Sequence, residues 1–163
     1  MDRPLKKPSL YLETSVWNFV YADDAPEKRD VTRQLFKEIA EGHYDTYISD
    51  AVVFEIGNTR GPKKQHLEAL IEEYKPNQLQ PNDSVTQLID AYLDAKVAST
   101  KSKTDLAHIA YTVAYNLNVI VSWNLKHIVR VKTRTAVNAV NKFLGFREIE
   151  IATPEEVIGY GTP

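Results

Sequence analysis

The fold of this chain is decided by one short stretch near its start, Ser9-Leu10-Tyr11-Leu12-Glu13-Thr14-Ser15-Val16-Trp17-Asn18-Phe19. Its first residues form an apolar run typical of a buried β-strand, and the residues after it have the spacing of a helix. A glutamate and two hydroxyls stand between these two parts. A carboxylate at the end of a buried strand is costly unless a cation or hydrogen-bond donors meet it. The rest of the chain therefore has to supply a partner for Glu13.

Strands and helices alternate along the remainder of the sequence. Further strands are predicted at 46–49, around Leu79, at 119–122 and at 148–151, with amphipathic segments between them. Asp50 and Thr104 stand where a side chain can cap the next helix, and Val53 is expected to face the core. The segment 153–156 has the pattern of a capping box. Strands interleaved with helices indicate an α/β fold with a mainly parallel sheet covered on both faces.

Composition limits the class of protein. The 163 residues are most simply one domain, 1–163, and the 43% hydrophobic and 26% charged content is that of an ordinary globular protein. The absence of cysteine excludes disulfides and thiolate metal sites. No apolar run approaches the roughly 20 residues of a membrane span, and the polar start, Met1–Pro8, lacks the apolar core of a signal peptide. We expect a cytoplasmic protein with no membrane segment.

Charge is distributed unevenly along the chain. The formal net charge is -2, yet the segment between Asp105 and Glu148 contains no acidic residue. The cations in that segment are Lys126, Arg130, Lys132, Arg134, Lys142 and Arg147. Such a segment indicates either a polyanionic partner or a solvated cationic face, and composition alone does not separate the two.

Three acids and one amide occupy positions that a parallel sheet brings together. Glu13 and Asn124 follow strands, Glu55 lies on a helix after a strand, and Asp105 opens a helix. The carboxyl ends of parallel strands share one edge of the sheet, and ligands bind there. Oxygen ligands without cysteine suit Mg²⁺ or Mn²⁺. The chemistry that follows most directly is metal-assisted hydrolysis of a phosphodiester.

Each acid also has an ordinary explanation. Asp105 alone is explained as a helix cap, Glu55 as a surface charge and Glu13 as the partner of a lysine. His108 and His127 follow Asp105 and Asn124 by three residues, so a zinc site of histidine and carboxylate is an alternative. The sequence has no glycine-rich phosphate loop and no nucleophile elbow.

Four segments resemble, in order, the motifs of PIN-domain proteins over nearly the whole chain. They are Tyr11-Leu12-Glu13-Thr14-Ser15-Val16, Ser49-Asp50-Ala51-Val52-Val53-Phe54-Glu55-Ile56, Asp105-Leu106-Ala107-His108-Ile109-Ala110 and Val121-Ser122-Trp123-Asn124-Leu125-Lys126-His127-Ile128. The chain departs from the usual motifs at Glu13, where the family has Asp, and at Asn124, which follows Trp123 in place of an aspartate.

This resemblance implies a three-layer α/β/α PIN-like domain with a Mg²⁺- or Mn²⁺-dependent ribonuclease site. Glu13, Glu55 and Asp105 would be acidic metal ligands, Asn124 the fourth site residue, and Ser15 a minor polar contributor. Many similar proteins are toxins of type II toxin-antitoxin modules, so an RNA substrate, a small antitoxin and a homodimer are the expected partners. Trp17 and Tyr21 belong either to a dimer surface or to the core.

The leading hypothesis is therefore a metal-dependent endoribonuclease whose cationic segment binds the RNA backbone. The residues expected to bind it are Lys126, His127, Arg130, Lys132 and Arg134. Because Asn124 carries no charge, we expect weaker metal binding than in a site of four acids, with a preference for Mn²⁺. The alternatives are a catalytically impaired PIN-like module that binds RNA or protein, and a small-molecule phosphoesterase on the same scaffold.

Overall fold

The apolar run near the start of the chain forms β1 (Ser9–Leu12), the central strand of a five-stranded sheet. The structure is a computed structural model, and it describes residues 6–163. The first five residues of the polar start, in which we expect no signal peptide, lie outside the described residues. All four residues of β1 are buried, because the strand has a neighbour on each side and helices over each face.

Every pairing in the sheet is parallel, and the strand order is β3-β2-β1-β4-β5. The other strands are β2 (Asp45–Ser49), β3 (Asn77–Leu79), β4 (Val119–Val121) and β5 (Glu150–Ala152). The predicted α/β fold with a parallel sheet is confirmed, and β5 is an edge strand as its alternating sequence predicts.

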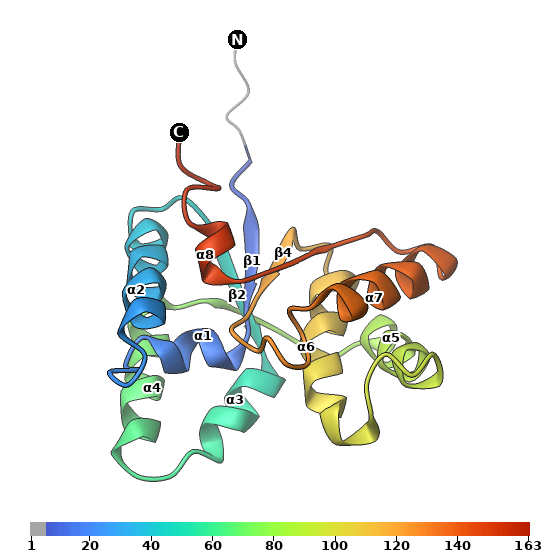
Figure 1. Cartoon of the computed structure of the whole chain (residues 1–163), viewed down its shortest axis with the longest axis horizontal. Helices are drawn as coiled ribbons and strands as arrows, with labels where there is room; N and C mark the ends of the chain where they lie inside the picture. Colours follow the sequence, from blue (N-terminus) through green and yellow to red (C-terminus); the bar gives the residue numbers. More distant parts are fainter. Residues whose placement is uncertain (1–5) are drawn as a thin grey trace.

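Helices cover both faces of this sheet and give a three-layer α/β/α architecture (Figure 1). One group contains α1 (Thr14–Phe19), α2 (Pro26–Ala40) and α4 (Pro62–Tyr74). The opposite group contains α5 (Asp83–Asp94), α6 (Lys103–Ala114) and α7 (Val131–Phe143). The remaining elements are α3 (Asp50–Gly57), a 3-10 turn at Thr100–Ser102 and α8 (Pro154–Val157).

The order of the strands creates a topological switch point between β1 and β4. The chain builds outward from β1 to β2 and β3, then returns to place β4 and β5 on the other side of β1. Leu12 pairs with Val121, and the amide of Glu13 donates to the Val121 carbonyl at 3.1 Å. Ligand sites in open α/β sheets lie at such a point, beyond the carboxyl ends of the strands. Glu13 and Ser122 are the first residues beyond the paired ends.

Some local predictions are wrong by a residue or two. Ser49, not Asp50, caps α3, because Ser49 still has extended backbone and its hydroxyl accepts from the amide of Ala51 at 3.2 Å. Helix α6 begins at Lys103, so Thr104 lies inside it and does not cap it. Val53 is 46% exposed and does not face the core. The capping box at Thr153 is confirmed.

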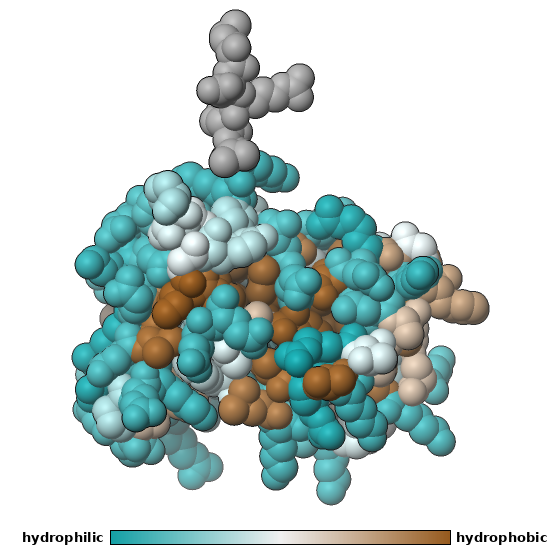
Figure 2. Space-filling model, turned by 45° about the horizontal axis from the view of Figure 1, so that its top comes forward, coloured by the Kyte–Doolittle hydropathy of each residue, from teal (hydrophilic) through white to brown (hydrophobic). Residues whose placement is uncertain are grey.

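The core lies on both sides of β1. It includes one of the two aromatic residues, Trp17 and Tyr21, that the sequence assigns either to the core or to a dimer surface. Trp17 is fully buried, and its indole N–H donates to the Leu12 carbonyl at 3.2 Å, whereas Tyr21 is 40% exposed. Trp17 therefore belongs to the core and only Tyr21 is available to a partner. Figure 2 shows one largely hydrophilic face with apolar residues gathered toward its middle. Across residues 6–163, every helix is too short or too polar to cross a membrane.

Candidate metal centre

Side chains from the residue after β1, from α3 and from α6 converge at the switch point. One ligand atom from each of Glu13, Glu55 and His108 lies within 4.8 Å of the other two. Asp105, in the first turn of α6, is close enough for its pKa to respond to the charges of Glu13 and Glu55. The Asn124 amide nitrogen lies 3.4 Å from Oδ1 of Asp105. The structure thus places Asp105 and Asn124 beside a close cluster of Glu13, Glu55 and His108.

Glu13 is held by a network of hydroxyls that joins the ends of β1 and β4. Its Oε1 accepts from the hydroxyls of Ser15 at 2.8 Å and Ser122 at 2.6 Å, and its Oε2 accepts from the Ser15 amide at 2.7 Å. These hydroxyls accept in turn from the amides of Trp123 and Asn124 at 2.8 and 2.9 Å. Hydrogen-bond donors are therefore the partner that the buried Glu13 requires, and Ser15 is central to the site.

Glu55 contacts the imidazole ring of His108, which belongs to α6. Its Oε1 accepts from the Thr14 hydroxyl at 2.8 Å and contacts Nε2 of His108. The other ring nitrogen of His108 lies 2.7 Å from the Tyr11 hydroxyl, which lies 2.7 Å from the Ser49 hydroxyl. This buried chain fixes the ring of His108, so the orientation of Glu55 is set from the core.

The pKa of Asp105 is raised above its usual range. Burial is the largest cause and the charge of Glu13 is the second, while His108 and His127 oppose them. Burial and a neighbouring like charge both disfavour the ionised carboxylate, and a cation bound beside Asp105 would favour it.

The pKa of His108 is raised in spite of its burial. Burial is the largest influence and lowers it, but the hydrogen bond with Glu55 and the charges of Glu13, Glu55 and Asp105 together outweigh burial. For Glu55, burial raises the pKa, whereas the hydrogen bond and charge of His108 lower it and prevail. The opposite directions of the two pKa shifts are those of a favourable interaction between protonated His108 and ionised Glu55.

The charge of His108 leads to a prediction about stability. A histidine with a raised folded-state pKa stabilises the fold fully below the unfolded value, about 6.5, and this stabilisation is lost as pH rises through the folded value. Glu55 has to be ionised as well, which sets a lower limit of about pH 5. We expect His108→Gln to cost about 2 kcal/mol near pH 5.5 and less at higher pH. Urea unfolding with EDTA measures this, and a cost that grows with pH would contradict it.

The carboxylates keep oxygen capacity for a metal ion. Both acceptor positions of Glu13 Oε1 are used, but its Oε2 accepts one hydrogen bond and retains a second position. Within the described chain, Glu55 Oε2 and Asp105 Oδ2 have no hydrogen-bond partner. Two ligands on one Mg²⁺ ion at about 2.1 Å lie at most about 4.2 Å apart. The ligand atoms of Glu13, Glu55 and His108 lie within 4.8 Å of one another, so a small shift of these side chains would bring the two glutamates to one cation.

Asn124 is oriented as a donor toward the acids. Its Oδ1 accepts from the amide of His127 at 2.9 Å, which leaves its Nδ2 facing Asp105. In this orientation the amide suits positioning Asp105 or a water molecule. The role predicted for Asn124 as a metal ligand stays a prediction.

The cations predicted to bind RNA follow Asn124. Lys126, His127, Arg130 and Lys132 are exposed, and Arg134 is half-buried on α7. His127 is near enough to influence the pKa of Asp105. The cationic segment therefore begins at the rim of the candidate centre.

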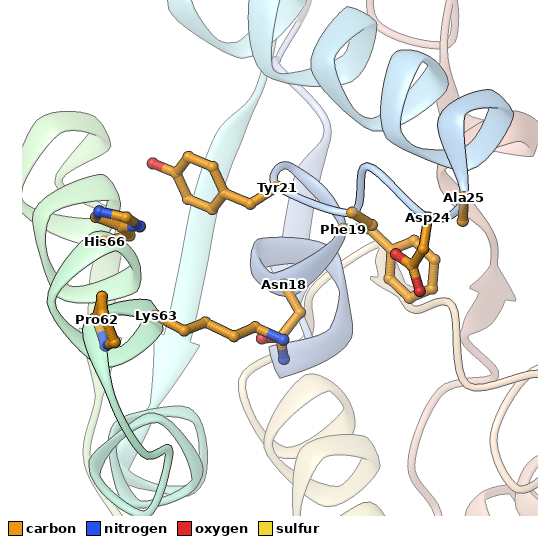
Figure 3. A pocket seen from close by; sticks show the side chains of 9 residues that line it. Asn18, Phe19, Tyr21, Asp24, Ala25, Pro62, Lys63 and His66 are labelled. Atoms are coloured by element: carbon orange, nitrogen blue, oxygen red, sulfur yellow. The ribbon is translucent and has the colours of Figure 1, made fainter.

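A hollow of about 450 Å³ lies on the other side of the centre, between α1, the start of α2 and α4 (Figure 3). The rings of Tyr21 and His66 are 5.6 Å apart there, and Lys63 extends across the hollow toward Asn18. None of the three carboxylates lines it. Asn18 is bonded to the carbonyl of Thr14 at 3.3 Å, so the hollow starts one helical turn away from the centre.

Sequence reasoning missed most of the supporting hydroxyls. Ser122 and Thr14 bind the acids, Tyr11 binds His108 and Ser49 binds Tyr11, and none of the four was predicted at the site. Ser122 was detectable, because it ends a strand next to Trp123 and Asn124. Tyr11 was detectable as a hydroxyl between two leucines of an apolar strand.

Comparison with known proteins does not extend these observations. No protein-family model matches the chain, and a search of curated proteins gives no significant match.

Proposed function

We propose that this protein is a divalent-metal-dependent endoribonuclease. The observation that carries the proposal is the cluster of Glu13, Glu55 and His108, with Asp105 close enough for its pKa to respond to both glutamates. Each of the three acids keeps oxygen capacity for a cation. Carboxylate oxygens without sulfur favour Mg²⁺ or Mn²⁺. Such an ion, when bound, supplies an activated water and stabilises charge on phosphate oxygens.

The chain's own residues have distinct parts in this proposal. Glu13 and Glu55 are held rigid by the serine network and by the Thr14 hydroxyl, which fixes the directions of their open positions. Asn124 donates toward Oδ1 of Asp105, so Oδ2 of Asp105 would be the oxygen left to hold an ion. Lys126, Arg130 and Lys132 lie exposed beyond Asn124 and would bind the RNA backbone.

RNA as the substrate and the wider biology rest on the resemblance to PIN-domain proteins. Under that proposal the chain is a toxin of a toxin-antitoxin pair, with a small antitoxin and a second copy of itself as partners and the cytoplasm as its location. Val53 and Phe54, 46% and 63% exposed on α3, are apolar side chains that suit a protein partner.

The second candidate is a PIN-like module that binds RNA or protein without cutting it. The observation that favours it is the contact of His108 with Glu55, since a charged histidine already neutralises one carboxylate of the centre. The same histidine keeps a zinc site of Glu13, Glu55 and His108 open as a variant of the metal centre.

The test is incubation of the purified protein with a pooled RNA ladder in Mn²⁺, Mg²⁺, Zn²⁺ or EDTA. We expect cleavage with Mn²⁺ that EDTA stops, and weaker activity with Mg²⁺. Binding without cleavage in every metal would overturn the enzyme and support the binding module. Cleavage of a generic phosphodiester but not of RNA would support a small-molecule phosphoesterase.

Metal affinity provides a separate prediction. With three acids, one of them already paired with His108, we expect Mg²⁺ to bind more weakly than low micromolar. Isothermal titration calorimetry measures it, and Asp90→Asn on the exposed face of α5 is the matched control. Mg²⁺ binding in the low micromolar range or tighter would contradict this expectation.

A further inference from the structure

A second hollow, of about 470 Å³, lies between the segment after α5 and the start of α7. Three of its lining side chains, Lys96, Arg130 and Lys132, carry a full positive charge, and His127 joins them. Ser99 and Ser102 add hydroxyls. No acidic side chain of the described residues lines this hollow. An anion that enters it would therefore meet several exposed cations and no like charge.

The backbone around the hollow adds to its positive character. Ser102 and Arg130 are the N-cap residues of α6 and α7, and neither makes a side-chain capping bond. Both residues line the hollow. The amino end of a helix carries partial positive charge and exposed N–H groups. The guanidinium of Arg130 donates to the Lys126 carbonyl at 3.2 Å, which uses one of its five donors.

Lys96 occupies a backbone position that favours glycine. Its φ is 55°, in the left-handed region. It follows α5, where its amide donates to the Leu93 carbonyl and the amide of Val97 donates to the Tyr92 carbonyl, each at 3.0 Å. These bonds form a Schellman ending, in which the left-handed residue is usually glycine. A lysine here places a cation at the hollow at the expense of backbone strain.

We propose that this hollow is a binding site for one phosphate group. His127 lines it, and the amide of His127 donates to Asn124, which contacts Asp105. The hollow is therefore next to the candidate metal centre. The source of the phosphate is assigned from the proposed function. If the protein is an endoribonuclease, this phosphate belongs to the RNA strand and neighbours the phosphate at which the strand is cut. Inorganic phosphate has the same recognition chemistry and is the other source.

The test compares two lysines in the same backbone conformation. Lys75 ends α4 with a φ of 47° and does not line the hollow. Lys96→Gly and Lys75→Gly each remove one cation and relieve the same strain, so both variants should melt at or above the wild-type temperature. Fluorescence anisotropy with a single-stranded RNA oligonucleotide in EDTA measures binding without cleavage, and inorganic phosphate serves as the competitor.

We expect Lys96→Gly to weaken RNA binding five- to tenfold and to reduce the slope of log affinity against log salt by about one. Lys75→Gly should bind as the wild type does. Phosphate should compete with RNA in the wild type and less effectively in Lys96→Gly. Equal RNA affinity of Lys96→Gly and wild type, or an equal loss in Lys75→Gly, would overturn the proposal. Phosphate binding that depends on Lys96, in a protein that does not bind RNA, would support the site and assign it to free phosphate.

Failure of the two proposals is distinguishable in these assays. Lys96-dependent binding without metal-dependent cleavage would keep the phosphate site and reject the endoribonuclease. Cleavage by the wild type with unchanged RNA affinity in Lys96→Gly would keep the enzyme and reject the phosphate site.

Discussion

Asp105→Asn is expected to lower the rate of metal-dependent RNA cleavage about a thousandfold, while RNA binding in EDTA is unchanged. The substitution removes one unit of negative charge next to the proposed cation. At about 4 Å and an effective dielectric constant of about 20, such a charge contributes roughly 4 kcal/mol, which corresponds to about three powers of ten in rate. Single-turnover cleavage with Mn²⁺ measures the loss.

Folding of the Asp105→Asn variant should be little affected. The raised pKa of Asp105, caused first by burial and then by the charge of Glu13, means that the ionised side chain destabilises the fold at neutral pH. Removing that charge offsets the loss of a favourable acid in the first turn of α6. Asp90→Asn makes the same change on exposed α5 and should retain full activity. Unchanged cleavage in Asp105→Asn would reject the proposed centre.

Glu13→Ala is expected to have the second large effect, on both stability and cleavage. Glu13 is 4% exposed, and it accepts hydrogen bonds from the Ser15 amide and from the hydroxyls of Ser15 and Ser122. Buried donors without an acceptor cost about 1–3 kcal/mol each. After relief of repulsion with the other carboxylates, we expect a net cost of about 3 kcal/mol, or a melting temperature about 10 °C lower.

Ser122→Ala is the matched test of this network. It removes one of the three donors to Glu13 and should cost about 1 kcal/mol. The variant that carries both substitutions should be less stable than Glu13→Ala alone by at most a few tenths of a kcal/mol. Strict additivity of the two losses in urea unfolding would show that Glu13 and Ser122 act independently and would contradict the network.

The fold was predictable because local features of the sequence determine its strands and helices. β1 and β4 are apolar runs of strand length, and each is followed by polar residues that open a loop or a helix. The rule that parallel strand ends share an edge then places Glu13 and Asn124 on the same side. That rule was sufficient to bring together four residues that lie far apart in the sequence.

The partners of each acid were not predictable, since they depend on register and on side-chain direction. The contact between Glu55 and His108 needs α3 and α6 to lie at one particular depth, which no local pattern encodes. The cap of α3 was misplaced by one residue because Ser49 and Asp50 are equally good caps in sequence, and only the backbone angles separate them. Lys96 was missed because a left-handed lysine has no sequence signature.

The parallel pairing of β1 with β4 also governs when the centre forms during synthesis. Glu13 and Ser122 are separated by 109 positions in the chain, and they meet only after β4 has docked beside β1. Contacts between such distant segments form late in folding, and the chain is made from its amino end. On the proposed function, a nascent chain would therefore lack the complete centre until β4 has been translated.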